Sequence, residues 1–357
     1  MIPQSLSRPW NKVRLVRTST LLNLKLRNAF SRKIKIGFGP IKSGERDINV
    51  RKWRIDPIVH YINENSDEYV ADFFFDEDCL DRFDIIVVVK VYSDQLLSEV
   101  KRQKARKCLA VFDIVDNPLG CKRSIFDDDE FVLALDGLIL SSPDQERRLE
   151  KHALPSVLIE HPVINSSYKT SYGETDRELR ILWQGFQHNA GGMRRLEQLV
   201  KEVSTSTGRR LKVVYHTNAL PNDDGFVQCI PWTIENAFQV LTEADIAIAI
   251  RDENRPWQEE KPSTKTIMYM AVGLPVVCKP TTADRLVIQH GRTGYFAFSA
   301  SEWRDYLSRL VVDPELRERV GRGARQHVLK NFSVPEIGEK YLRFLSELRR
   351  SRPGVAA

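Results

Sequence analysis

The sequence lacks several features that would assign it to a specialised class of protein. Its five cysteines show neither paired metal-ligand spacing nor a disulfide-dense pattern, which indicates reduced thiols in a cytosolic protein. No apolar run approaches the roughly 20 residues that span a bilayer. Acidic residues are absent before Glu45, whereas ten lysines and arginines lie between Arg8 and Lys42. The 357 residues, 42% of them hydrophobic, are enough for two domains with separate cores.

The acid-free N-terminal segment mixes basic side chains with large apolar ones. Over residues 8–35, lysines and arginines are interleaved with Trp10, Leu22, Leu26 and Phe30. A basic amphipathic helix of this kind can lie on an anionic membrane surface. The alternative is a solvated or disordered arm, or a helix packed on its own protein. Because the basic residues are confined to one end and form no recognisable motif, we do not expect nucleic-acid binding.

Apolar runs alternate with helical stretches along most of the chain, which predicts doubly wound parallel sheets. Residues 163–178 lack apolar periodicity and are rich in serine and threonine, which is typical of a linker. Before it, the predicted strands are Ile34–Phe38, Tyr69–Phe75, Asp84–Val89, Cys108–Ile114, Gly137–Leu140 and Val157–Glu160, and the predicted helices are Trp53–Asn65, Tyr92–Ala105 and Pro143–His152. After it, the predicted strands are Arg180–Trp183, Leu211–Tyr215, Val227–Ile230, Asp245–Ile250 and Val276–Cys278, with helices at Met193–Val203, after caps at Ser301 and Asp313, and at Glu336–Arg349.

The most informative stretch runs from Glu259 to Phe298. Pro262 has no N–H and a fixed φ, which suits the first turn of a helix with Ser263 or Thr264 as its cap. Gly273 then ends the helix. Apolar residues recur at i, i+3, i+4 and i+7, which predicts a buried stripe made of Ile267, Met270, Ala271 and Leu274.

The start of this helix is a candidate anion site. Backbone N–H groups at a helix start point outward, and Lys265 adds a positive charge in the first turn. The expected ligand is a phosphate group, contacted by Ser263, Thr264 and Lys265. A solvated surface lysine is the alternative for Lys265, and Glu260, just before the helix, is then only a partner of the helix dipole.

The same stretch resembles the C-terminal domain of GT-B glycosyltransferases, in particular those similar to glycosyltransferase family 4. The shared pattern is K-x-x-x-Y-M-A-x-G-L-P-V-V from Lys265, followed by R-x-V-I-x-H-G-x-T-G-Y from Arg285. The resemblance covers about residues 180–345 and is only architectural before them. The family often carries two glutamates separated by seven residues. Glu260 matches the first, whereas Met268 stands in place of the second, which commonly holds the nucleotide ribose.

The resemblance implies an α/β fold of the GT-B type, in which two Rossmann-like domains face each other across a cleft. A C-terminal helix returns to the N-terminal domain and buries Tyr341, Phe344, Leu345 and Leu348. The expected divisions are a basic arm (1–33), an N-terminal acceptor domain (34–162), the linker (163–178), a C-terminal donor domain (179–334), and a crossover helix with a tail (335–357).

Further site residues are expected on both sides of the cleft. Asp113 and Asp116 follow a predicted central strand, where ligand sites of α/β proteins gather, so either carboxylate could orient or deprotonate an acceptor hydroxyl. A turn or a helix cap is the alternative. Glu260 would accept hydrogen bonds from the donor sugar. In the resembled fold, the loop that begins at Gly185 approaches the donor diphosphate, and Arg194 could contact the same group. Arg251, in a long polar loop, is a further candidate for the crevice, and a solvated loop charge is the alternative for it.

The implied activity is transfer of a sugar from a nucleotide-sugar to a hydroxyl of a glycan or lipid-linked acceptor, in making cell-envelope polysaccharide, lipopolysaccharide or glycoprotein glycan. The nucleotide-sugar is a co-substrate, and no metal or other cofactor is expected. The expected location is the cytoplasm, with residues 8–35 as the candidate contact with the inner face of the membrane.

Three other classes stay open: a GT-B sugar-nucleotide epimerase, a metal-dependent GT-A enzyme that uses Asp127–Asp129, and a non-catalytic donor-binding subunit. Asp127–Asp129 precedes a helical stretch and does not close a strand, which favours a helix cap over a metal site.

Overall fold

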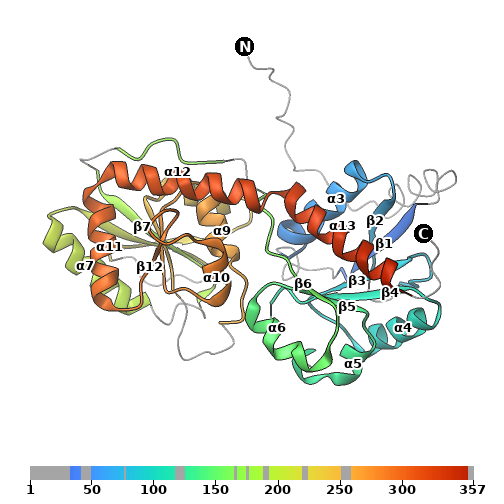
Figure 1. The fold of residues 1–357 in the computed structure, drawn as a ribbon. Helices are drawn as coiled ribbons and strands as arrows, with labels where there is room; N and C mark the ends of the chain where they lie inside the picture. The colour runs from blue at the N-terminus through green and yellow to red at the C-terminus, as the bar shows by residue number, and fades with distance from the viewer. Residues whose placement is uncertain are drawn as a thin grey trace, which may run out of the picture.

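Two parallel six-stranded sheets organise the chain into two lobes, which lie side by side in Figure 1. The computed structural model describes residues 33–41, 50–75, 78–116, 125–164, 167–173, 177–187, 193–218, 224–250 and 259–352. Every strand pair within the two sheets is parallel. The predicted pair of α/β units is therefore confirmed.

The first sheet has the strand order β2-β1-β3-β4-β5-β6. Its central strands β3 and β4 are buried along their whole length, as expected when helices cover both faces of a parallel sheet. Its strands are β1 (Ile34–Gly39), β2 (Tyr69–Phe73), β3 (Ile85–Val89), β4 (Leu109–Asp113), β5 (Gly137–Leu140) and β6 (Ser156–Leu158). Its helices are the π-helical turn η1 (Arg51–Ile55), α3 (Asp56–Asn65), α4 (Asp94–Ala105), the 3₁₀ turn η2 (Ile125–Asp127), α5 (Asp129–Leu133), α6 (Pro143–Leu149) and the 3₁₀ turn η3 (Glu150–His152).

The second sheet has the order β12-β11-β10-β7-β8-β9, so the strand order reverses between β7 and β10. Ligands of open α/β sheets bind outside the carboxyl ends of the strands at such a reversal. Its strands are β7 (Leu179–Gln184), β8 (Leu211–Thr217), β9 (Val227–Pro231), β10 (Ile246–Ala249), β11 (Val276–Cys278) and β12 (Tyr295–Phe296). Its helices are α7 (Met193–Thr207), α8 (Ala237–Glu243), α9 (Thr264–Ala271), α10 (Thr282–Val287), α11 (Ala300–Val312) and α12 (Pro314–Asn331).

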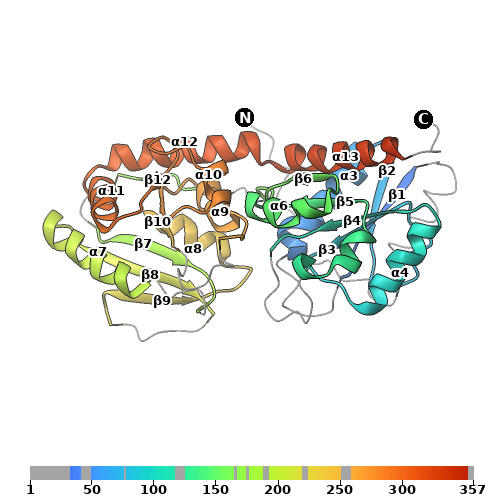
Figure 2. The ribbon, with the colours of Figure 1, turned by 60° about the horizontal axis from the view of Figure 1, so that its bottom comes forward.

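The last helix, α13 (Val334–Ser351), crosses back to the first lobe. Figures 1 and 2 show α12 along the second lobe and α13 continuing beyond it, beside α3. Gly338 makes this approach possible, because a Cβ there would collide with the ring of Tyr61 on α3. The predicted stripe faces the first lobe and is buried: Tyr341, Phe344, Leu345 and Leu348. The predicted return of the C-terminal helix is confirmed.

The chain passes between the lobes twice, near Val163 and near Phe332, and these two segments are hydrogen-bonded to each other. The N–H of Val163 donates to the carbonyl of Phe332 at 2.7 Å, and Val163 also forms a bridge with Ser333. Beyond this point the chain is fixed to the second lobe: Lys169 Nζ donates to the carbonyl of Ala244 at 2.7 Å. The two connecting segments thus lie side by side and are hydrogen-bonded to each other.

The residues that cap three helices, α5, α11 and α12, agree with the sequence prediction in two cases and differ in one. The cap of α11 is Ser299, which forms a capping box with Glu302, and the prediction of Ser301 was wrong. Asp313 caps α12 as predicted, and Asp128 caps α5, which confirms the cap predicted for the acidic run before it. The domain boundaries stay a prediction, and the basic arm lies outside the described residues except for Lys33. Within the described ranges, no helix is both long and apolar enough to cross a membrane.

Candidate active site

Helix α9 begins at Thr264 with Ser263 as its cap, as predicted, but Pro262 lies before the cap and not in the first turn. Ser263 occupies the cap position, but its side chain makes no capping hydrogen bond. Its Oγ is buried and has no hydrogen-bond partner among the described residues. The helix itself is regular, since the N–H of Ile267 donates to the Ser263 carbonyl at 2.9 Å. The first N–H groups of a helix have no partner within it, so Ser263 Oγ and these groups offer hydrogen bonds to an anion.

Lys265 reaches from the first turn of α9 to the end of β7. Its Nζ lies 4.8 Å from the centre of the Trp183 ring, a cation–π distance. Gly185 directly follows β7, and a Cβ at that position would collide with both Lys265 Nζ and the Trp183 ring. The absence of a side chain at Gly185 therefore makes room for the ammonium group. Two residues predicted for the donor site, Gly185 and Lys265, are brought together at the reversal of strand order.

Buried polar atoms without partners gather at the same edge of the second sheet. Gln184 Oε1 and Trp183 Nε1 lie at the end of β7, and His216 Nδ1 lies near the end of β8; none of the three has a hydrogen bond among the described residues. His216 Nε2 is 2.9 Å from Asn236 Oδ1. Burial lowers the pKa of His216, although Asn236 opposes the shift. Because buried polar groups are nearly always paired, this concentration is typical of a site that a ligand or water completes.

Glu260, on the loop before α9, is held by the first lobe. Its carboxylate Oε1 accepts a hydrogen bond from Arg148 Nη1 at 2.6 Å. Its backbone carbonyl accepts from Ser142 Oγ at 2.8 Å and from Gln145 Nε2 at 3.3 Å. Its other carboxylate oxygen, Oε2, is buried and has no hydrogen bond within the described part of the chain. These contacts place the loop at the junction of the two lobes.

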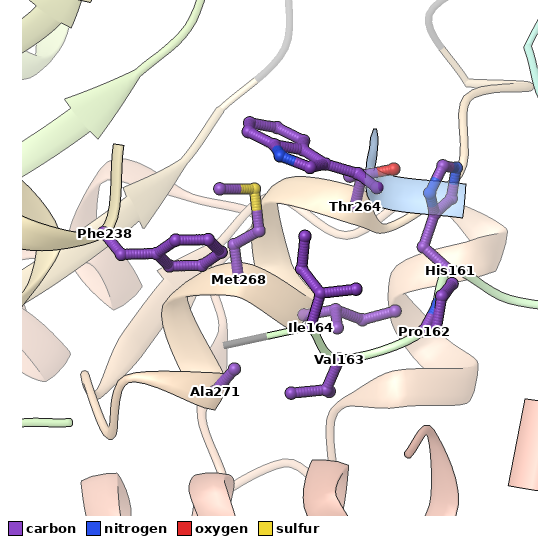
Figure 3. A pocket seen from close by; sticks show the side chains of 10 residues that line it. His161, Pro162, Val163, Ile164, Phe238, Thr264, Met268 and Ala271 are labelled. Carbon is purple, nitrogen blue, oxygen red and sulfur yellow. The ribbon is translucent and has the colours of Figure 1, made fainter. Parts of the chain in front are cut away.

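Met268 lines a small pocket between the lobes, one turn after Lys265. Figure 3 shows its side chain beside Phe238 and Ile164. Trp53, on η1 of the first lobe, lines the same pocket, with its ring centre 6.3 Å from that of Phe238. The free volume is about 10 Å³, about the requirement of a single water molecule. A thioether in apolar contacts thus occupies the position where the resembled family commonly has a ribose-binding glutamate.

Asp113 lies in the core of the first lobe. Both of its oxygens accept hydrogen bonds from Arg54, at 2.8 Å from Nε and 2.8 Å from Nη2, and it also accepts the hydroxyl of Tyr341. Burial lowers the pKa of Arg54, but Asp113 and Tyr341 together oppose burial strongly enough that the net pKa is raised. Asp113 is therefore neither a turn residue nor a helix cap. It forms a buried ion pair with Arg54, and the hydrogen bond from Tyr341 fastens α13 to β4. A catalytic role for Asp113 stays a prediction.

Asp116 lies at the carboxyl edge of the first sheet and is paired with a lysine that the sequence analysis did not single out. Lys90 Nζ, directly after β3, is 2.8 Å from Asp116 Oδ1, and each side chain is about a quarter exposed. His161, which follows β6, is buried near them, and burial together with the cations Arg54 and Lys90 holds its pKa well below the ordinary value. Positions directly after strands were the signal for Lys90 and His161.

The remaining predicted residues are only partly described. Arg194 lies in the first turn of α7 as predicted, but its side chain is outside the described part, and Arg251 lies outside the described residues altogether. One grouping of possible metal ligands occurs in the described ranges, Cys79 with Asp81 and Glu99. The guanidinium group of Arg102 already forms ion pairs with Asp81 at 2.7 Å and with Glu99 at 2.6 Å. Both carboxylates are therefore neutralised by a side chain.

Comparisons with known proteins give a family match for part of the chain and fold matches for most of it. Residues 194–343 match the model of a family described as glycosyl transferase-like. No curated protein matches the sequence.

Several solved structures are similar in fold. Sucrose-phosphate synthase from Thermosynechococcus elongatus is 11% identical with a TM-score of 0.63, and the match covers 90% of this chain and 100% of that protein. HepE from Anabaena, solved with UDP and glucose, is 12% identical with a TM-score of 0.63 over 88% of this chain and 100% of HepE. TarM is 12% identical with a TM-score of 0.56 over 73% of this chain, which spans about half of TarM (54%). The chain therefore has the GT-B fold of two facing Rossmann-like domains, and its residues 194–343 are similar to the glycosyl transferase-like family.

Proposed function

We propose that this chain transfers a sugar from a nucleotide-sugar donor to a hydroxyl group of a glycan or lipid-linked acceptor. One observation carries the proposal. The start of α9, the Lys265 ammonium group and the side-chain-free Gly185 meet at the strand-order reversal of the second sheet. Unpaired buried polar atoms lie beside them. The family match and the HepE structure with UDP and glucose support a nucleotide-sugar as the ligand.

The donor diphosphate would bind at the start of α9. Sugar transfer develops negative charge on the leaving diphosphate, and groups already fixed around it lower the barrier. Lys265 supplies a positive charge, while Ser263 Oγ and the helix N–H groups supply hydrogen bonds. Because Gly185 has no side chain, the Lys265 ammonium group can lie against the end of β7, where it would meet a phosphate. These groups need no metal, so we propose metal-independent transfer.

The sugar and the acceptor would lie between the lobes. Glu260 Oε2 is a buried acceptor without a hydrogen bond among the described residues, so it can take one from a donor-sugar hydroxyl. On the acceptor side we assign Asp116, because its carboxylate is partly exposed at the carboxyl edge of the first sheet. Asp113 is left out of this assignment, because Arg54 and Tyr341 engage both of its oxygens in the core. The acceptor's place in cell-envelope glycan synthesis, and attachment to membrane through residues 8–35, remain proposals.

A second candidate function is a non-catalytic donor-binding subunit. Met268 and its apolar surroundings favour it, because they leave no carboxylate at the position that commonly holds the ribose. The same donor cleft would then bind a nucleotide-sugar without turning it over.

One experiment separates these functions. The protein is incubated with a panel of nucleotide-sugars, with and without EDTA, and released nucleotide and altered sugar are measured. We expect slow donor hydrolysis that EDTA does not abolish, together with transfer when an acceptor is present. Isomerised sugar would instead indicate an epimerase, and binding without turnover a subunit. Failure of every nucleotide-sugar to bind would contradict all three.

A further inference from the structure

Helix α6 of the first lobe presents three consecutive contacts to the donor loop. Ser142, Gln145 and Arg148 are spaced three residues apart, which places them along one face of the helix. Ser142 is the cap of α6, and its hydroxyl also donates to the carbonyl of Glu260. Gln145 is fully buried and donates to the same carbonyl. Arg148 reaches the Glu260 carboxylate.

The three contacts divide into two kinds. Ser142 and Gln145 bind only the backbone of Glu260, so they hold the loop in place whatever side chain stands there. Arg148 instead donates to the side chain of Glu260, through the carboxylate Oε1. A second contact between the lobes, from Thr282 on α10 to Asp144 on α6, keeps α6 docked independently. Arg148 is therefore not needed to hold the loop, and its contact acts on the orientation of the carboxylate.

The burial and the hydrogen bonds of the Glu260 carboxylate indicate the role of this orientation. The Glu260 side chain is only 13% exposed, and Oε2 has no hydrogen bond in the described part of the chain. Charge-assisted hydrogen bonds fix geometry strongly. With Oε1 held by Arg148, Oε2 is left in a defined direction with its lone pairs unused. A hydroxyl group satisfies such an oxygen by donating a hydrogen bond.

We infer that Arg148 is a positioning residue for the donor sugar: the acceptor-side lobe completes the donor site by orienting Glu260 toward a sugar hydroxyl. This inference rests on the proposed function. It assigns Arg148 no contact with the nucleotide, because the carboxylate that Arg148 contacts lies before α9 and not at the start of that helix. Loss of Arg148 should consequently affect recognition of the sugar and leave recognition of the nucleoside diphosphate intact.

A double-mutant cycle tests the inference. Arg148→Ala, Glu260→Gln and the double variant are compared with the parent in kcat/KM for the nucleotide-sugar and in the Kd of the nucleoside diphosphate. Because Arg148 is more than a third exposed, we expect the lower end of the range for a charged hydrogen bond, about a tenfold loss of kcat/KM. The Kd should change less than about twofold. Arg148→Lys should recover part of the loss, because it restores the charge without the guanidinium geometry.

The double-mutant cycle decides between the two possibilities. If Arg148 acts through Glu260, changing Arg148 should cause no further loss of kcat/KM once Glu260 is changed. Arg322→Ala is the matched control, since Arg322 also pairs with one glutamate, Glu318, on the exposed α12. Arg148→Gln replaces Arg148→Ala if the alanine variant fails to fold.

Three outcomes would count against the inference. Additive losses in the double variant, or equal losses in nucleoside diphosphate binding, overturn it while the proposed function stands. An active parent with unchanged Arg148 variants does the same. A parent that binds neither nucleotide-sugar nor nucleoside diphosphate overturns both.

Discussion

Met268→Glu would restore the glutamate that the resembled family commonly has, yet we expect it to destabilise the protein. Met268 is 7% exposed and lines the pocket with Trp53, Phe238 and Ile164. The pocket has about 10 Å³ of free volume, so the introduced carboxyl group would gain at most one water molecule. Among the described residues that line this pocket, His161 is the ionisable one, and its lowered pKa keeps it neutral near pH 7.

The expected loss of stability depends on whether the carboxyl group is buried in its ionised or its protonated form. An unpaired carboxylate in apolar surroundings costs more than its protonated form, so the group takes up a proton. Holding a glutamate with an unfolded pKa of about 4.3 protonated at pH 7 costs about 1.36 × 2.7, or about 3.7 kcal/mol, and about 1 kcal/mol at pH 5. The folded pKa is raised above the unfolded one, so this cost is absent below about pH 4 and grows as the pH rises.

Urea denaturation at pH 5 and pH 7 measures this effect. We expect the difference in unfolding free energy between the parent and Met268→Glu to widen by about 2.7 kcal/mol between the two pH values. Met268→Gln is the matched control: it introduces a polar group of the same size, and its cost should not depend on pH. A Met268→Glu protein that is as stable as the parent at both pH values would refute the apolar assignment of this pocket.

Two further changes test how α13 is fastened to the first lobe. Tyr341→Phe removes the hydroxyl that donates to the buried Asp113, and we expect urea denaturation to show a loss of about 1.5–3 kcal/mol; an unchanged midpoint would mean that this contact is dispensable. Gly338→Ala places a Cβ against the Tyr61 ring, and we expect a loss of about 1–3 kcal/mol in the same assay, since overpacked contacts force neighbours to shift; equal stability would show that α3 and α13 approach less closely.

The helix that carries the donor site could be predicted because its signals are local. Ile267, Met270 and Ala271 recur at helical spacing and are buried as predicted. Gly273 has a φ of +84°, the left-handed conformation expected of a glycine that ends a helix. Gly185 and Lys265 are far apart in sequence, so the assignment of Gly185 to the same donor site relied on the resemblance to a known family.

The contacts between distant residues could not be predicted. Asp113 is paired with Arg54 and Tyr341, which lie 59 and 228 residues away in the sequence, so no local pattern connects them. The same holds for Arg148 and Glu260, separated by 112 residues and brought together by the docking of the two lobes. The cap at Ser299 was available from sequence, because a glutamate three residues later completes a capping box.

The central claim is that the start of α9 binds the diphosphate of a nucleotide-sugar, and calorimetric titration with nucleoside diphosphates tests it most directly. Lys265→Ala is compared with the parent and with Lys201→Ala. Lys201 is a matched control because its ammonium also lies over an aromatic ring, that of Phe226 at 5.0 Å, and it is not among the predicted donor contacts. We expect Lys265→Ala to weaken binding by about tenfold to hundredfold, as the loss of a charged hydrogen bond does, and Lys201→Ala to bind like the parent. Equal binding by the parent and Lys265→Ala, or a parent that binds no nucleoside diphosphate, would contradict the account.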